Sequence, residues 1–143
     1  MRRILAAAAL AVGLAAERLT AQAADADSLL AAARRAARAW RLHDFDGLLA
    51  GATAVRVLLP GAEPSSALRV AQVAELLRTF TESAEELEVE VQVARAVDAD
   101  RAYVEIQRVF RVRGTEARRA QTLYLGLRRV GATYRASEVR VVP

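Results

Sequence analysis

The sequence predicts an α+β fold in which three N-terminal helices pack on one strongly curved, mostly antiparallel sheet. Apolar residues recur at helical spacing as far as Phe80, whereas from Leu87 onward they recur at every second position, the period of a strand with one buried face. The connections after Leu87 are too short for parallel crossovers, so neighbouring strands are expected to run antiparallel. A sheet with its helices gathered on one face is the α+β arrangement.

One domain accounts for residues 24–143, because a chain of this size buries about two thirds of its surface around a single core. The chain has 143 residues, 54% of them hydrophobic, and no cysteine. Disulfides and cysteine-ligated zinc are therefore excluded, and packing must hold the fold together. The formal net charge is +4, but three of the arginines lie within the first 23 residues, and along the strands the basic residues interleave with acidic ones. This pattern argues against a nucleic-acid partner.

Residues 1–23 are predicted to be a signal peptide. They combine a cationic start, an uncharged apolar stretch over residues 4–16, and the small residues Ala21 and Ala23 that a signal peptidase reads. A membrane-spanning helix needs about 20 apolar residues, and this stretch is shorter. No stable membrane anchor is therefore expected after cleavage. We expect a periplasmic or secreted protein. A cut after Ala15 also fits, and the alternative is the Ala-rich first helix of a cytoplasmic domain.

The first helix of the mature chain is expected to begin at Asp25, Asp27 or Ser28, which are favourable N-cap residues. Apolar residues follow at helical spacing, and most arginines lie off that stripe, so one face should pack on the sheet and the other should be solvated. The apolar positions are Leu29, Leu30, Ala33, Ala36, Ala37 and Trp40.

A turn at His43 and Asp44 leads into a short second helix over residues 45–49, with Gly51 as its C-terminal cap. Residues 55–59 are β-branched and apolar, which predicts a strand that ends at the Pro60-Gly61 turn. Ser65 or Ser66 is then expected to cap a third helix. Its apolar face comprises Val70, Val73, Leu76, Leu77 and Phe80.

Four strands are expected after the third helix. In the first of them, alternation predicts a buried face made of Leu87, Val89, Val91 and Val93. The second, residues 102–112, loses its phase at Arg108, where we expect a β-bulge. The third is centred on residues 123–127 and the last covers residues 134–142, with turns at 98–100, 113–115 and 131–132.

Residues 39–49, with the sequence AWRLHDFDGLL, resemble the recurring link between the first helices of the nuclear transport factor 2-like superfamily, which includes SnoaL-like and ketosteroid isomerase-like proteins. A closer resemblance is to a family of short exported bacterial domains of unknown function near lumazine-binding-like proteins. It is carried by residues 58–61, 72–80 and the terminal hairpin 123–135. The resemblance covers residues 25–142 and implies a cone of helices and curved sheet. Isomerases, dehydratases, cyclases and non-catalytic binding domains share this superfold.

The resemblance implies where catalytic groups would lie, since enzymes of this type place an acid or base inside the cone, where apolar walls shift its pKa. Glu105 and Tyr103 share one face of a predicted strand, and Tyr124 is placed to approach from the next strand, so these three are the candidate catalytic residues for polarising a carbonyl. The alternative, which we favour, puts Glu105 on a charged outer face in ion pairs with residues such as Arg128 and Arg140.

The other candidate residues are aromatic. Trp40 is expected in the core and, together with Phe80 and Tyr124, is a candidate for lining a ligand cavity. The single histidine, His43, falls in a turn outside the cone of this fold and is expected to be a capping or exposed residue. The sequence contains no phosphate-binding loop, nucleophile elbow or cluster of metal-ligating residues, so neither a metal nor another cofactor is expected.

These patterns favour a non-catalytic module that holds a small apolar ligand in its cone or a protein partner on its sheet. The alternative is an isomerase-like or dehydratase-like enzyme that uses Glu105 and a tyrosine in the cone. A homodimer through the sheet face bearing Glu88, Glu90, Arg108 and Arg128 is compatible with the first hypothesis.

Overall fold

The computed structural model describes residues 2–143, and the side chains of residues 13–143. Three helices and six strands follow one another in the order α1 (Arg2–Arg41), α2 (Phe45–Leu48), β1 (Ala54–Leu58), β2 (Leu68–Arg69), α3 (Val70–Thr81), β3 (Ala84–Ala96), β4 (Arg101–Val112), β5 (Arg118–Val130) and β6 (Thr133–Val142). Met1 and the side chains of residues 2–12, which belong to the predicted signal peptide, lie outside the described residues.

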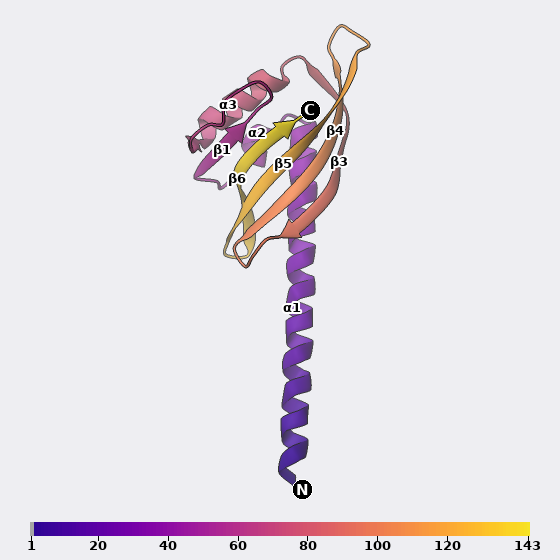
Figure 1. Ribbon diagram of the computed structural model, residues 1–143, viewed down its shortest axis with the longest axis vertical. Coiled ribbons are helices and arrows are strands. Elements are labelled where there is room, and N and C mark those ends of the chain that lie inside the picture. The colour runs from indigo at the N-terminus through magenta and orange to yellow at the C-terminus, as the bar shows by residue number, and fades with distance from the viewer. Residues whose placement is uncertain (1) are drawn as a thin grey trace.

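All six strands form one sheet in the order β2-β1-β6-β5-β4-β3. The pairs are antiparallel except that of β1 with β6, which is parallel and joins two distant parts of the chain. The sheet curves around the C-terminal half of α1, while α2 and α3 lie near its β1 side (Figure 1). The predicted α+β fold, with helices on a curved and mostly antiparallel sheet, is therefore confirmed.

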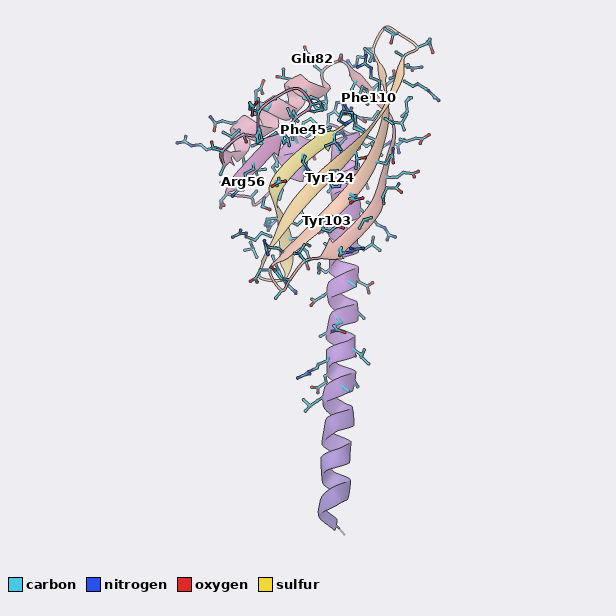
Figure 2. All side chains as sticks on the ribbon, viewed as in Figure 1. Phe45, Arg56, Glu82, Tyr103, Phe110 and Tyr124 are labelled. Carbon is cyan, nitrogen blue, oxygen red and sulfur yellow. The ribbon has the colours of Figure 1, made fainter. Side chains whose placement is uncertain are left out.

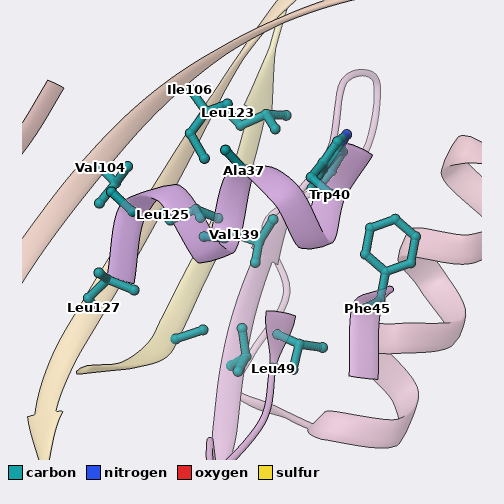
Figure 3. Packing of buried hydrophobic residues seen from close by; sticks show 14 of the residues in the cluster. Ala37, Trp40, Phe45, Leu49, Val104, Ile106, Leu123, Leu125, Leu127 and Val139 are labelled. Atoms are coloured by element: carbon teal, nitrogen blue, oxygen red, sulfur yellow. The ribbon is translucent and has the colours of Figure 1, made fainter. Parts of the chain in front are cut away.

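The interior of the cone is filled with side chains. Trp40, Val104, Ile106 and Leu123 are fully buried, and Trp40 packs edge-on against Phe45 with ring centroids 5.3 Å apart. Figure 3 shows aliphatic side chains of β4, β5 and β6 directed at this part of α1. The expectation that Trp40 belongs to the core is confirmed, and the arginines between residues 34 and 41 are exposed as the helical pattern predicts.

The N-terminal half of α1 projects away from the domain (Figure 1). The helix is continuous through Asp25, Asp27 and Ser28, so the prediction that a new helix is capped there is wrong. The segment that precedes Asp25 is rich in alanine, the residue with the highest intrinsic helix propensity, and it contains no proline. Asp25 instead accepts a hydrogen bond from Arg129, 2.7 Å away, which lowers the pKa of its carboxyl group. Among the described residues, no helix is both long and apolar enough to cross a membrane.

Removal of residues 1–23 is expected to leave the free energy of unfolding unchanged within about 0.5 kcal/mol. Every side chain from Gly13 to Ala23 is exposed, so its loss removes no packing from the domain. Urea denaturation of the full chain and of residues 24–143 would measure the difference. A loss above about 1 kcal/mol would show that this segment packs on the domain and is not a removable leader.

The segment before α3 also departs from the prediction, because neither Ser65 nor Ser66 caps that helix. The Ser65 hydroxyl accepts a hydrogen bond from the Val57 amide at 2.8 Å, which ties the loop to β1. The chain then forms the short strand β2 beside β1. The helix begins only at Val70, where the amide of Arg69 donates to the side chain of Gln72 at 3.2 Å.

Two bulges alter the predicted burial pattern of β3. The register of β3 on β4 shifts between Glu86 and Glu88 and again between Val91 and Val93. Val89 and Val91 face the core, but Val93 lies opposite Glu105 on the outer face. The prediction that Leu87 and Val93 share the buried face with them is therefore wrong, because each bulge reverses the alternation.

The bulge predicted at Arg108 is also wrong. Residues 101–111 of β4 pair with β5 without a shift, and Arg108 stays in phase with the buried Ile106 and Phe110. Its side chain points into the cone and is only 1% exposed. Arg108 therefore does not belong to the outer face through which a homodimer is predicted.

Candidate functional site

The three predicted catalytic residues lie together, but on the outer face of the sheet. Glu105 is directly opposite Tyr124 in the β4–β5 register, and its neighbours along the strand, Val104 and Ile106, are fully buried on the other face. Tyr103 has the same orientation as Glu105, two positions earlier (Figure 2). The hypothesis that Glu105 acts inside the cone is therefore corrected, since strand alternation turns its carboxylate away from the interior.

These residues and Arg140 line an open pocket of about 460 Å³. The guanidinium of Arg140 lies 4.6 Å from the centre of the Tyr124 ring, a cation–π contact. Its Nε is buried and has no hydrogen-bond partner among the described residues. No ion pair within the described part of the chain includes Glu105, so the predicted ion pairs with Arg128 and Arg140 do not form.

A buried ion pair inside the cone was not predicted. The Nε of Arg108 donates to Oε2 of Glu86 at 3.1 Å, and its Nη2 donates to Oε1 of the same carboxylate. The two side chains are 1% and 2% exposed. The third nitrogen of the guanidinium, Nη1, donates to the side chain of Gln121 at 3.1 Å. All three nitrogens of this buried charge are therefore satisfied, as burial requires.

Aromatic rings surround the same guanidinium. Its central carbon lies 4.0 Å from the ring centre of Phe110, 5.4 Å from that of Trp40 and 5.9 Å from that of Phe80. Burial lowers the pKa of Arg108, and the neighbouring carboxylate of Glu86 opposes that shift. Stacked rings and a carboxylate together replace the water that this cation loses on folding.

His43 completes this cluster. It was expected to be a capping or exposed residue outside the cone, and the backbone of the turn confirms the capping role. It has a φ of 53°, and the amides of His43 and Asp44 donate to the carbonyls of Trp40 and Ala39 in the Schellman pattern that ends α1. The imidazole stacks on Phe45, and its Nε2 lies 3.1 Å from Oε1 of Glu86. The turn is where the sequence predicts it, but the side chain reaches inward.

The contacts of this cluster indicate that it stabilises the fold. Both carboxylate oxygens of Glu86 accept hydrogen bonds from Arg108, and both residues are buried, so the carboxylate has no free access to a substrate proton. His43, whose side chain is 26% exposed, reaches the surface, and Phe80 and Gln121 are likewise only partly buried. Within the described residues no group of three or more His, Cys, Asp or Glu side chains is placed to hold a metal ion.

An apolar groove runs beside α3. It has a volume of about 730 Å³, and its walls come from α3 and from the segment after β1. Leu76 and Phe80 lie one helical turn apart and face it, whereas Val73 and Leu77 of the same helix are fully buried against the core. The lining residues are Leu59, Pro60, Ala62, Leu68, Ala71, Gln72, Glu75, Leu76, Thr79 and Phe80.

The three predicted ligand-binding residues do not form one site. Phe80 lines the groove, whereas Trp40 is 0% exposed in the core and Tyr124 lies on the outer face of the sheet. The other groove residues were not predicted as a site. Leu76 was placed on the apolar face of the third helix, and in the structure it is 42% exposed beside the groove.

No protein-family model matches the sequence, and no curated protein matches it. Solved structures do match its fold. A ketosteroid isomerase-like protein from Erwinia carotovora atroseptica has a TM-score of 0.65 and 17% identity, covering 80% of this chain and 92% of its own. An NTF-2 like protein of unknown function from Shewanella oneidensis has a TM-score of 0.60 and 10% identity, covering 81% and 97%. A DUF4783 family protein from Bacteroides ovatus has a TM-score of 0.59 and 12% identity, covering 75% and 90%.

At these identities the likeness shows the fold alone. The chain has the nuclear transport factor 2-like fold that the segment over residues 39–49 predicts. The closer resemblance to a family of exported domains stays a prediction.

Proposed function

We propose that the mature domain is an exported, non-catalytic module that binds a small apolar ligand in the groove beside α3. The observation that carries this proposal is the groove itself, a shallow, open and mostly apolar depression of about 730 Å³ that includes the exposed side chain of Leu76. Ligand pockets for small molecules have volumes of about 300–1,000 Å³ and mostly apolar walls. The interior of the cone, where the sequence analysis expected the ligand, is filled with side chains, so the ligand site is the groove on the outside of α3.

The walls of the groove favour an uncharged, apolar ligand. Seven of its lining positions are Leu, Pro, Ala or Phe, and Glu75 is the single charged side chain among them. A cation or anion would have to give up its hydration without a set of converging partners there, which is unfavourable. An aliphatic or aromatic ligand instead gains about 25 cal/mol for each Å² of apolar surface that it buries.

The variant Leu76→Glu is expected to weaken binding of an uncharged apolar dye, N-phenyl-1-naphthylamine, by at least tenfold, or about 1.4 kcal/mol. The new carboxylate would either be desolvated by the dye or keep water in the groove. Dye fluorescence during titration of the protein measures the dissociation constant. Leu42→Glu is the matched control, because Leu42 is 66% exposed and lies outside the groove.

The competing hypothesis is an isomerase-like or dehydratase-like enzyme acting at the outer-face pocket of Tyr103, Glu105 and Tyr124. Its support is that these three side chains line one pocket with Arg140. Glu105→Gln separates the two hypotheses in the same titration. If Glu105→Gln abolished dye binding while Leu76→Glu left it intact, the ligand would lie on the sheet and the groove proposal would be wrong.

A further inference from the structure

A row of arginines crosses the outer face of the sheet at the end opposite the Arg108 cluster. Arg101 of β4 is directly opposite Arg128 of β5, and Arg128 is directly opposite Arg135 of β6. Like charges at directly opposed positions of a sheet repel and destabilise the pairing. The three guanidinium groups therefore repel one another in the folded protein, and a bound anion would reduce that repulsion.

A pocket lies over this row. It has a volume of about 530 Å³ and is lined by the three arginines, by Arg56 of β1 and by the loop over residues 51–54. Figure 2 labels Arg56 on β1. Gly51 has a φ of 75°, and the guanidinium of Arg135 lies against it. A side chain at this position would collide, because a Cβ at Gly51 would be only 2.5 Å from the central carbon of that guanidinium. The concavity is therefore built from two separate parts of the chain.

The other charges around the pocket neutralise the row only in part. Asp98 forms an ion pair with Arg101 at 2.7 Å, and Nη1 of Arg135 donates to the carbonyl of Ala50 at 3.2 Å. Glu138 lines the pocket and is opposite Arg56 in the β1–β6 register. Within the described residues, neither Arg56 nor Arg128 takes part in an ion pair of 4.0 Å or less.

We propose that this pocket binds a phosphate group, with Arg128 at its centre, Arg101 and Arg135 on either side of it, and Arg56 beyond Arg135 on β1. Arginine donates two parallel hydrogen bonds to a phosphate, and phosphate recognition by several arginines is favourable because each guanidinium is always charged. Four arginines face two acidic side chains here, so a doubly charged phosphate balances the pocket better than a single carboxylate does. The site does not depend on the groove beside α3 and uses none of its residues.

Isothermal titration with inorganic phosphate tests the site, with sodium chloride adjusted to keep the ionic strength constant. The full chain is expected to bind phosphate saturably, and Arg128→Gln is expected to weaken this binding at least about tenfold, the effect of losing a charge-assisted hydrogen bond. Arg113→Gln is the matched control, because Arg113 is an exposed arginine in the β4–β5 turn, outside the pocket. It is expected to bind phosphate as the unmodified chain does.

Thermal unfolding without phosphate shows whether Arg128→Gln still folds. Its Tm is expected to be about 1–4 °C above that of the unmodified chain, because the variant removes the repulsion with Arg101 and Arg135. An unchanged or lower Tm would overturn the claim that the row is held under repulsion. Equal phosphate affinity in Arg128→Gln, or equal losses in Arg128→Gln and Arg113→Gln, would overturn the site.

Flotation with phosphatidylcholine vesicles, with and without phosphatidic acid, separates a soluble phosphate from a lipid headgroup. Binding of inorganic phosphate without vesicle binding assigns a soluble ligand. Flotation that requires both phosphatidic acid and Arg128 assigns the headgroup, with the same recognition chemistry. Absence of saturable binding in both experiments would refute the proposal.

Discussion

Glu86→Gln is expected to destabilise the domain by about 3–5 kcal/mol, the usual effect of removing one partner from a buried ion pair. The amide cannot neutralise the guanidinium of Arg108, which is 1% exposed and packed against aromatic rings. The same change removes the negative partner of His43. Chemical denaturation of the variant and of the unmodified chain measures the loss.

A second variant separates the charge from the packing at this place. In the double variant Glu86→Leu, Arg108→Met no buried charge remains, so most of the stability lost in Glu86→Gln should return. A double-mutant cycle that also includes the single variants Glu86→Leu and Arg108→Met gives the coupling energy between the two side chains. If Glu86→Gln lost less than about 1 kcal/mol, the pair would have to be solvated in solution, contrary to its burial.

Trp40→Ala is expected to have a comparable effect, about 3–5 kcal/mol, because it leaves a large cavity between α1 and the sheet. The ring is fully buried, contacts Phe45 edge-on and lies beside the guanidinium of Arg108. Its Nε1 is buried without a hydrogen-bond partner among the described residues. Trp40→Phe keeps an aromatic ring and removes that unpaired donor, so it should cost less than about 1.5 kcal/mol.

The variant Trp40→Phe also tests where the ligand binds. Because Trp40 has no exposed surface, Trp40→Phe is expected to bind the apolar dye as the unmodified chain does. Urea denaturation gives the stabilities, and the fluorescence titration gives the affinities. Weaker dye binding in a stably folded Trp40→Phe protein would place the ligand in the cone and contradict the groove proposal.

Periodicity predicted the long strands well and their side-chain orientation less well. In β4 and β5 the alternation is unbroken, so the faces of Val104, Glu105 and Leu123 follow from the sequence alone. In β3 two bulges reverse the alternation, and the pairing with β4 decides where they lie. Glu86 lies just before Leu87, where the predicted alternation of this strand begins, so its burial in the core was not predicted.

The interpretation of Arg108 shows the same limit. A charged residue among apolar ones indicates either a break in the pattern or a buried ion pair, and the sequence offers no means of choosing. The choice depends on Glu86, which is 22 residues away, and on His43, which is 43 residues from Glu86. The groove beside α3 and the arginine pocket likewise combine residues from separate strands and loops.

The sequence by itself determined the α+β class and the order of the helices and long strands, but not the short strand β2 or where α1 and α3 begin. The spacing of apolar residues and the turn residues act over a few neighbouring positions, which is why they determine this much. The tertiary structure alone decided which charges are buried together and which surfaces are hollow. Those features arise from contacts between residues far apart in the chain, where register, bulges and the turn after α1 place each side chain.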